Sequence, residues 1–260
     1  MSYNFNYNNQ DSMASLCSYL SMLSYENTET QQKWFSKLFS EYDFVNSSHK
    51  SLQYSIIMDN KNKYIFFVIR GTDTNNYRES LRDILVSMKV WHRKIGDSKF
   101  HTGYSNNGDI LKDIFLEYIH TYKDYHVVFT GHSLGGVIAK YIATNSNNNS
   151  DCYTYGAPRL SDNPVSSKRV NMFNYINVGD SIPLWYPSYK MSKKDTYYIL
   201  PTEVIHHDKI TDSSSIGTKA MVSSLYKLLR NTLIGDKVGS LAGHSIKNYI
   251  RRLKRNINEN

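Results

Sequence analysis

The chain has 260 residues, of which 40% are hydrophobic and 13% aromatic. That supply of core-forming residues excludes a disordered chain, and the length suits a single α/β domain. The formal net charge is +8, and residues 216–260 alone hold +7 of it, so an anionic partner is expected for the C-terminal segment rather than for the whole surface.

Cysteine content and apolar runs limit the cellular setting. Cys17 and Cys152 have neither the density of a disulfide scaffold nor the spacing of a zinc site, so we expect two buried thiols. The N-terminus has no basic start followed by an apolar run, and no apolar stretch is long enough to cross a bilayer. These features predict a protein that is cytoplasmic or peripheral to a membrane.

The N-terminal part begins with a polar tail, expected over residues 1–11. Apolar residues then recur at helical spacing, which predicts a helix over 12–25 with Asp11 or Ser12 as its N-cap. Further along, residues 51–73 contain two β-rich runs separated by a polar tetrapeptide at 59–62. This pattern predicts a β-hairpin.

Helical and strand-like patterns alternate over the central part of the chain. The expected helices lie at 81–90, 109–122 and 134–145, and the expected strands at 125–130, 152–155 and 172–178. Such alternation favours a mainly parallel sheet with helices on both faces. Residues 12–260 are therefore expected to form one α/β domain that ends in the basic segment 216–260.

A candidate nucleophile stands at the turn between one expected strand and the next helix. Residues 131–135 have the sequence Gly-His-Ser-Leu-Gly, and a G-x-S-x-G pattern in this context lifts the serine hydroxyl above a sheet. Ser133 is therefore predicted to be the nucleophile, with an incidental tight turn as the alternative. A serine hydroxyl needs a base within hydrogen-bond reach and an acid that orients that base.

Candidates for these partners follow in the order acid, then histidine. Asp180 comes just after an expected strand, where α/β sheets place site residues, although it could also be a turn or helix-cap aspartate. His244 follows a glycine at the start of a helical pattern and is preferred as the base over His207. Leu134, through its backbone N–H, and Thr72, after the strand that ends in Arg-Gly, are the expected oxyanion donors.

Five short motifs, in this order, resemble those of the class 3 lipases, and the resemblance spans roughly residues 51–249. The motifs are RGTD (70–73), FHTGY (100–104), GHSLGG (131–136), YTYGAPRL (153–160) and NVGDSIP (177–183). The resemblance implies an α/β-hydrolase fold with Ser133, Asp180 and His244 as catalytic triad and with Thr72 and Leu134 as oxyanion hole. His101 and Arg159 also match family positions and are expected to be structural supports.

The resemblance also implies an activity and a lid. The activity is that of a lipase or carboxylic ester hydrolase, which cleaves triacylglycerol, diacylglycerol or phospholipid, phospholipase A1 cleavage included, through an acyl-enzyme and without metal or cofactor. A lipase-like protein that binds lipid or acts as a scaffold without turnover is the alternative. Residues 74–82 occupy the place of the family's lid, and their short, polar sequence argues against a large apolar one. Asp83 matches an acidic position after the lid.

The C-terminal segment has features that the family does not explain. Between residues 246 and 255 apolar residues recur at helical spacing, and we expect this stripe to pack on the domain while the basic residues face solvent, with insertion of the stripe into a membrane as the alternative. The basic residues are then available to an anionic membrane surface. No basic-aromatic motif accompanies them, so no nucleic-acid partner is expected.

Overall fold

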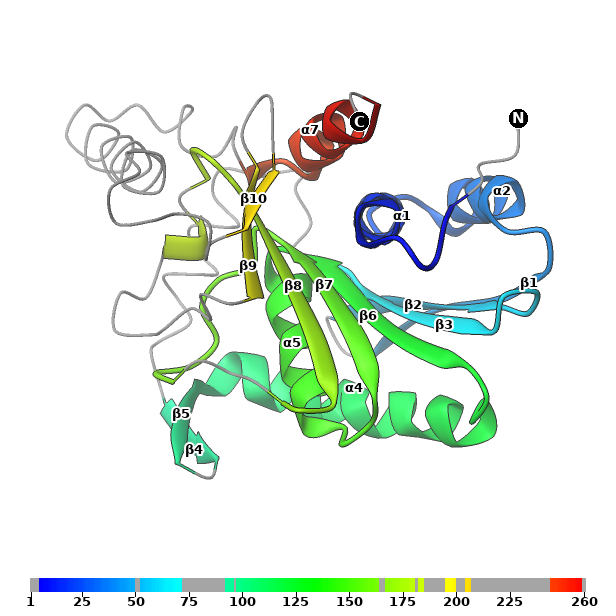
Figure 1. Cartoon of the computed structure of the whole chain (residues 1–260). Coiled ribbons are helices and arrows are strands. Elements are labelled where there is room, and N and C mark those ends of the chain that lie inside the picture. The colour runs from blue at the N-terminus through cyan, green and yellow to red at the C-terminus, as the bar shows by residue number, and fades with distance from the viewer. Residues whose placement is uncertain are drawn as a thin grey trace.

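The structure, a computed structural model, is organised around one eight-stranded sheet covered by helices on both faces (Figure 1). It describes residues 5–49, 52–71, 92–95, 97–163, 167–180, 182–184, 195–199, 204–206 and 244–258. The order of the strands is β1-β2-β3-β6-β7-β8-β9-β10. Their bounds are β1 (Tyr42–His49), β2 (Leu52–Asp59), β3 (Tyr64–Ile69), β6 (His126–His132), β7 (Ser150–Tyr155), β8 (Val170–Asn177), β9 (Thr196–Ile199) and β10 (Val204–His206).

The centre of the sheet is parallel and its edges are antiparallel. Strands β3, β6, β7, β8 and β9 run in one direction, β1 and β2 form an antiparallel meander with β3, and β10 returns beside β9. The prediction of a mainly parallel sheet is therefore confirmed, as is the hairpin of β2 and β3. A separate pair, β4 (His92–Ile95) and β5 (Ser98–His101), lies outside the main sheet.

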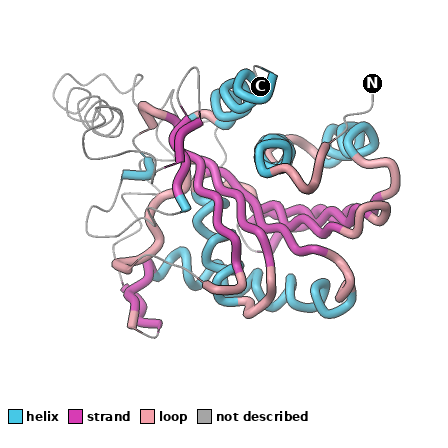
Figure 2. The backbone as a smooth tube through the Cα atoms, viewed as in Figure 1, coloured by secondary structure: helices cyan, strands magenta, loops and turns pink. Residues whose placement is uncertain are grey.

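Two sets of helices enclose the sheet, as Figure 2 shows. One face packs against α4 (Thr102–Thr121) and α5 (Leu134–Asn145), and the other against α1 (Gln10–Leu23), α2 (Thr28–Leu38) and α7 (Ile246–Asn258). The short 3-10 helix η1 (Ile182–Leu184) follows β8. Each face of the sheet thus has its own apolar core.

Strand β3 shows why this sequence forms a central strand. Phe67 and Ile69 belong to the core on the α4–α5 side, whereas Phe66 and Val68 belong to the core on the α1–α7 side. Successive side chains of a strand point to opposite faces, so a continuous apolar run suits a strand that is buried on both sides. The β-branched and aromatic residues of this run also favour extended backbone.

The N-terminus is more ordered than the sequence predicts. Helix α1 begins at Gln10, within the segment expected to be a tail, and its N-cap is Asn9 rather than Asp11 or Ser12. The Asn9 side chain accepts a hydrogen bond of 2.9 Å from the Ser12 backbone N–H, which satisfies one of the unpaired donors of the first turn. Just before the helix, the Tyr7 hydroxyl donates to Asp59 at the end of β2.

Other differences concern segments whose pattern is weak. Helix α4 begins at Thr102, seven residues earlier than predicted, and α2 and β1 were not predicted. Helix α5 matches its expected range of 134–145. The helix expected at 81–90 lies outside the described residues.

The cysteine prediction is confirmed, because Cys17 and Cys152 are free thiols and both are buried. Burial raises the pKa of the Cys152 thiol to about 12 and that of Cys17 well above its usual range. Among the helices of the described ranges, we find none with both the length and the apolar character needed to cross a bilayer.

Candidate active site

Ser133 stands on a sharp turn between β6 and α5 with φ of 57° and ψ of −125°. A non-glycine residue rarely adopts a positive φ, and this strain is typical of a nucleophile elbow. The flanking glycines permit the tight packing that the turn requires. A Cβ atom on Gly135 would lie 2.1 Å from the carbonyl oxygen of Ile69, and one on Gly131 would lie 2.5 Å from the Gly135 carbonyl carbon.

Asp180 follows β8 at the carboxyl ends of the parallel strands and is 1% exposed. Its Oδ1 accepts a hydrogen bond of 2.9 Å from the Ile182 backbone N–H. Its Oδ2 lies 2.8 Å from His244 Nδ1 and accepts a hydrogen bond of 2.7 Å from the Tyr249 hydroxyl. An ionised carboxylate is only an acceptor, so this arrangement provides a donor for each oxygen of a charged, buried side chain.

His244 is fully buried where the chain enters α7. Its contact with Asp180 requires the space that Gly156 leaves at the end of β7. A Cβ atom on Gly156 would lie 2.7 Å from Asp180 Oδ2 and 2.9 Å from His244 Nδ1, and the φ of this residue is +59°, which favours glycine. The structure thus brings together two of the residues that the sequence singled out, although 64 positions separate them.

Two contacts, one of His132 and one of the Ser133 backbone, connect the serine to the surroundings of this pair. The ring of His132 packs against that of His244 at a centroid distance of 4.6 Å, and the Ser133 backbone N–H donates to the carbonyl of Tyr155, the residue before Gly156. Ser133 Oγ and His244 Nε2 are both buried and have no hydrogen-bond partner among the described residues. One can donate and the other accept, and such pairs are often loose before substrate binds.

Leu134 begins α5, so its backbone N–H is one of the unpaired donors at a helix N-terminus. This position suits a developing oxyanion beside Ser133. The other expected donor, Thr72, lies outside the described residues, as do the expected lid at 74–82, Asp83 and the alternative base His207. The described chain reaches Gly71, directly before Thr72.

Several residues near the site had no role in the sequence analysis. His132 was given no role, but its Nε2 lies 2.6 Å from the carbonyl oxygen of His244 and its Nδ1 lies 3.1 Å from the Tyr25 hydroxyl. The position of His132 beside the nucleophile was the one available signal. His101, by contrast, is buried and its ring stacks on Tyr104, as expected of a structural support.

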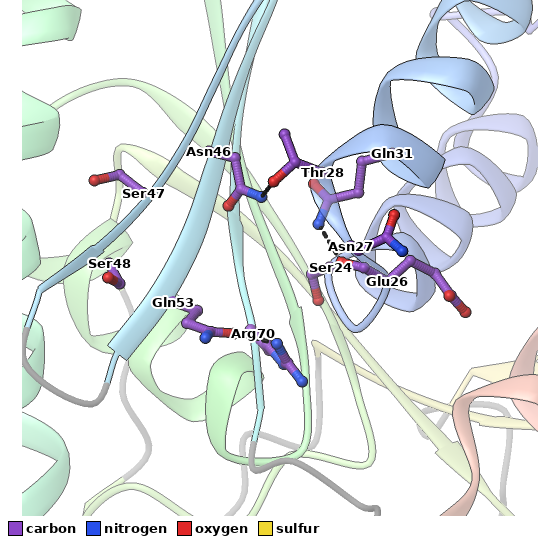
Figure 3. A pocket seen from close by; sticks show the side chains of 10 residues that line it. All are labelled: Ser24, Glu26, Asn27, Thr28, Gln31, Asn46, Ser47, Ser48, Gln53 and Arg70. Carbon is purple, nitrogen blue, oxygen red and sulfur yellow. Dashed lines mark hydrogen bonds between the residues drawn. The ribbon is translucent and has the colours of Figure 1, made fainter.

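A polar pocket of about 330 Å³ lies between the α1–α2 connection and strands β1 and β2 (Figure 3). Hydroxyl, amide and charged side chains line it, and Arg70 forms part of its wall. The Arg70 side chain donates to Gln53 and lies over the ring of Tyr25. None of the three candidate triad residues lines this pocket.

Helix α7 confirms one expectation for the basic segment and corrects another. The apolar stripe is buried on the domain, and it consists of Ile246, Tyr249, Ile250 and Leu253. Lys247, Arg251 and Lys254 are exposed as predicted, but Arg252 is not a free surface charge. Its guanidinium donates to the carbonyl oxygens of Val178 and Ile199 at 3.3 Å each, and its partial burial lowers its pKa.

The sheet order, the strained elbow and the carboxylate after β8 define the α/β-hydrolase fold. Residues 66–189 match the family described as lipase (class 3). Within this fold, that segment of the chain is similar to the class 3 lipases.

Several individual lipases are also similar to this chain. A lipase from Rhizopus niveus is 29% identical over 117 residues, which are 40% of this chain and 29% of that protein. The solved lipase from Rhizopus microsporus var. chinensis has a TM-score of 0.62 at 20% identity and covers 73% of this chain and 74% of its own. A triacylglycerol lipase whose catalytic centre is described as a serine protease triad has a TM-score of 0.59 at 20% identity and covers 75% of this chain and 82% of its own.

The match spans less than a third of the Rhizopus niveus protein, and the solved structures are similar in fold at low identity.

Proposed function

We propose that this protein is a serine ester hydrolase that cleaves acyl esters of glycerolipids. The observation that carries the proposal is the buried hydrogen bond of 2.8 Å between His244 Nδ1 and Asp180 Oδ2, next to an elbow serine whose Oγ has no partner among the described residues. The triad description of the similar triacylglycerol lipase supports the same roles. In this proposal the substrate is triacylglycerol, diacylglycerol or phospholipid, including phospholipase A1 cleavage.

The reaction proceeds through an acyl-enzyme. Ser133 Oγ attacks the ester carbonyl carbon while His244 Nε2 takes the hydroxyl proton, and the same nitrogen then returns that proton to the departing alcohol. Water, activated by the same imidazole, hydrolyses the acyl-serine. Asp180 holds the proton of the neutral ring on Nδ1 and stabilises the imidazolium that forms.

The charge that develops on the carbonyl oxygen needs donors that are already in place. In this proposal the two donors are the Leu134 backbone N–H and the Thr72 side-chain hydroxyl, which is the group that valine lacks. Losing one oxyanion donor typically costs about a hundredfold to a thousandfold in rate. Thr72→Val is therefore expected to lower kcat by that order with little change in KM, whereas an unchanged kcat would place the second donor elsewhere.

Active-site labelling separates this proposal from a scaffold that binds lipid without turnover. A fluorophosphonate probe is expected to label the native protein at one site and to leave Ser133→Ala unlabelled. A native protein that neither takes up the probe nor hydrolyses any of the three lipid classes would favour the scaffold.

A pair of alanine variants tests which histidine is the base. His244→Ala is expected to abolish hydrolysis, and if only His207→Ala did so the base would be His207.

We further infer that the protein is cytoplasmic or peripheral to a membrane and that α7 draws it to anionic lipid. Lys247, Arg251 and Lys254 are exposed on this helix, and each basic residue near an anionic surface adds about 1 kcal/mol of attraction. Sedimentation with vesicles that contain phosphatidylserine, at low and high salt, tests this. A variant with glutamine at all three positions is expected to lose binding, and equal binding to neutral vesicles would contradict the inference.

A further inference from the structure

Three residues from different parts of the chain form a hydrogen-bonded series beside the candidate triad. The Tyr25 hydroxyl, just after α1, lies 3.1 Å from His132 Nδ1. On the other side of this ring, His132 Nε2 lies 2.6 Å from the carbonyl oxygen of His244. His132 and His244 are both buried. The series therefore links the segment after α1 to the main chain of the proposed base.

The chemistry of the partners allows one arrangement of protons in this series. Burial holds the pKa of His132 well below its usual range, and the proximity of His244 lowers it further, so the ring is neutral. A neutral imidazole has one donor and one acceptor nitrogen. The carbonyl of His244 can only accept, so His132 Nε2 bears the hydrogen. Nδ1 must then accept, and Tyr25 is its donor.

Neutrality of this ring matters for the proposed base. The centroids of the His132 and His244 rings are 4.6 Å apart, and His244 must become an imidazolium during acyl transfer. A second positive charge at that distance in a buried site would oppose this step. The hydrogen bond from the Tyr25 hydroxyl disfavours protonation of His132 Nδ1, because that nitrogen is the acceptor of the bond.

Tyr25 also touches the loop that leads to the proposed oxyanion donor. A Cβ atom on Gly71 would lie 2.3 Å from the Tyr25 hydroxyl oxygen and 2.6 Å from the carbonyl oxygen of His132. Thr72 follows Gly71 directly. One hydroxyl thus packs against this loop and at the same time bonds the residue beside Ser133.

We propose that Tyr25 and His132 are positioning residues, which hold the main chain of His244 in place and keep the neighbouring ring uncharged while His244 takes up a proton. The inference rests on the proposed function, because it assigns these residues a task in that reaction. His132 contacts His244 and Tyr25 contacts Gly71, but neither residue reacts with substrate. Their loss is expected to lower kcat more than it raises KM.

A conservative replacement of His132 tests the bond to the carbonyl. The side-chain amide of glutamine can donate from about the position of Nε2, whereas leucine cannot. With a water-soluble short-chain ester, His132→Leu is expected to lower kcat about tenfold or more while KM stays within about twofold. His132→Gln is expected to recover most of that loss. Equal kcat values for the native protein and His132→Leu would overturn the role of this bond.

A matched tyrosine pair tests the other end of the series. Tyr25→Phe removes the donor to His132 Nδ1 and is expected to lower kcat. The control Tyr7→Phe also removes a partly buried hydroxyl bond, to Asp59, at the opposite ends of the parallel strands, and is expected to leave kcat unchanged. If Tyr25→Phe and Tyr7→Phe have the same kcat, Tyr25 has no positioning role. This comparison still decides the matter if His132→Leu does not fold.

A spectroscopic signal keeps this inference separate from the proposed function. The Nδ1 proton between His244 and Asp180 is expected to give a resolved low-field ¹H NMR resonance, and Tyr25→Phe to broaden or shift it where Tyr7→Phe does not. If the native protein has no esterase activity but shows this pattern, the proposed function fails and the positioning remains. If the native protein is active and both variants keep its kcat and this resonance, only the positioning is overturned.

Discussion

Tyr249 donates a hydrogen bond of 2.7 Å to Asp180 Oδ2, the carboxylate oxygen that also faces His244. The Tyr249 hydroxyl in turn accepts a hydrogen bond of 3.0 Å from the Asn177 backbone N–H at the end of β8. His244, the proposed base, lies just before helix α7. Tyr249, five positions later and within this helix, is a further donor to Asp180, the proposed acid. Both contacts depend on the docking of this helix.

Tyr249→Phe removes one of the donors to a buried carboxylate. Hydrogen bonds to charged groups contribute about 1.5–3 kcal/mol, so we expect a loss of stability of that order and a fall in kcat of about tenfold as Asp180 becomes less well placed. Urea unfolding and steady-state kinetics measure the two effects. Tyr155→Phe is the control, because Tyr155 is also buried but its hydroxyl donates to the carbonyl of Ala14 in α1. If the two variants have equal kcat, the Tyr249 bond is only structural.

Gly156→Ala is expected to damage the site more than the fold. The new Cβ would lie 2.7 Å from Asp180 Oδ2 and 2.9 Å from His244 Nδ1, so the hydrogen bond between them must lengthen. We expect kcat to fall about a hundredfold, as for a misplacement of about 1 Å.

Gly108→Ala is the matched control for this clash. Its Cβ would lie 2.1 Å from Tyr141 Cδ1, at the contact between α4 and α5. Thermal unfolding is expected to show a lower Tm for Gly108→Ala, while the kcat of its folded fraction stays native. A Gly156→Ala variant with native kcat would contradict the arrangement of the pair.

Acid is expected to destabilise the protein through His132. Its pKa is lowered by burial in the folded state, whereas an unfolded histidine has a pKa of about 6.5. Below that pH the unfolded chain binds a proton that the folded chain does not, so the free energy of unfolding falls as the pH drops, by up to about 1.4 kcal/mol per pH unit for one proton. Above about pH 7.5 the ring is neutral in both states and contributes no pH dependence. Urea unfolding between pH 8 and pH 5 is expected to show that the free energy of unfolding falls less steeply with pH in His132→Gln than in the native protein. Equal slopes for the two proteins would contradict a lowered pKa of His132 in the folded state.

The two thiols are expected to be unreactive in the folded protein. Burial raises the pKa of Cys152 to about 12 and that of Cys17 well above its usual range, and the thiolate is the reactive form. Iodoacetamide at pH 8 should therefore modify neither cysteine in the native state and both after denaturation, as measured by intact mass. Rapid modification of the native protein would show that at least one thiol is accessible.

The elements that the sequence predicts well are those with strong local patterns. The apolar run of β3, the hairpin with β2 and the bounds of α5 follow from periodicity and turn residues. Helix α2 and strand β1 were missed. Their polar composition hides the few residues that pack, such as Phe35, which is buried against the rings of Phe39 and Phe44.

The sequence by itself determined the Ser133 elbow, because glycine spacing and a strand-to-helix change act on a few consecutive residues. It also placed Asp180 after a strand and His244 before a helix. Only the tertiary structure decided that these two side chains meet at 2.8 Å and that Tyr249 shares their carboxylate. Likewise, it alone brought Tyr25 to His132, 107 positions away. Contacts of this kind depend on how separate helices dock on the sheet, and a local pattern does not encode the distance between them.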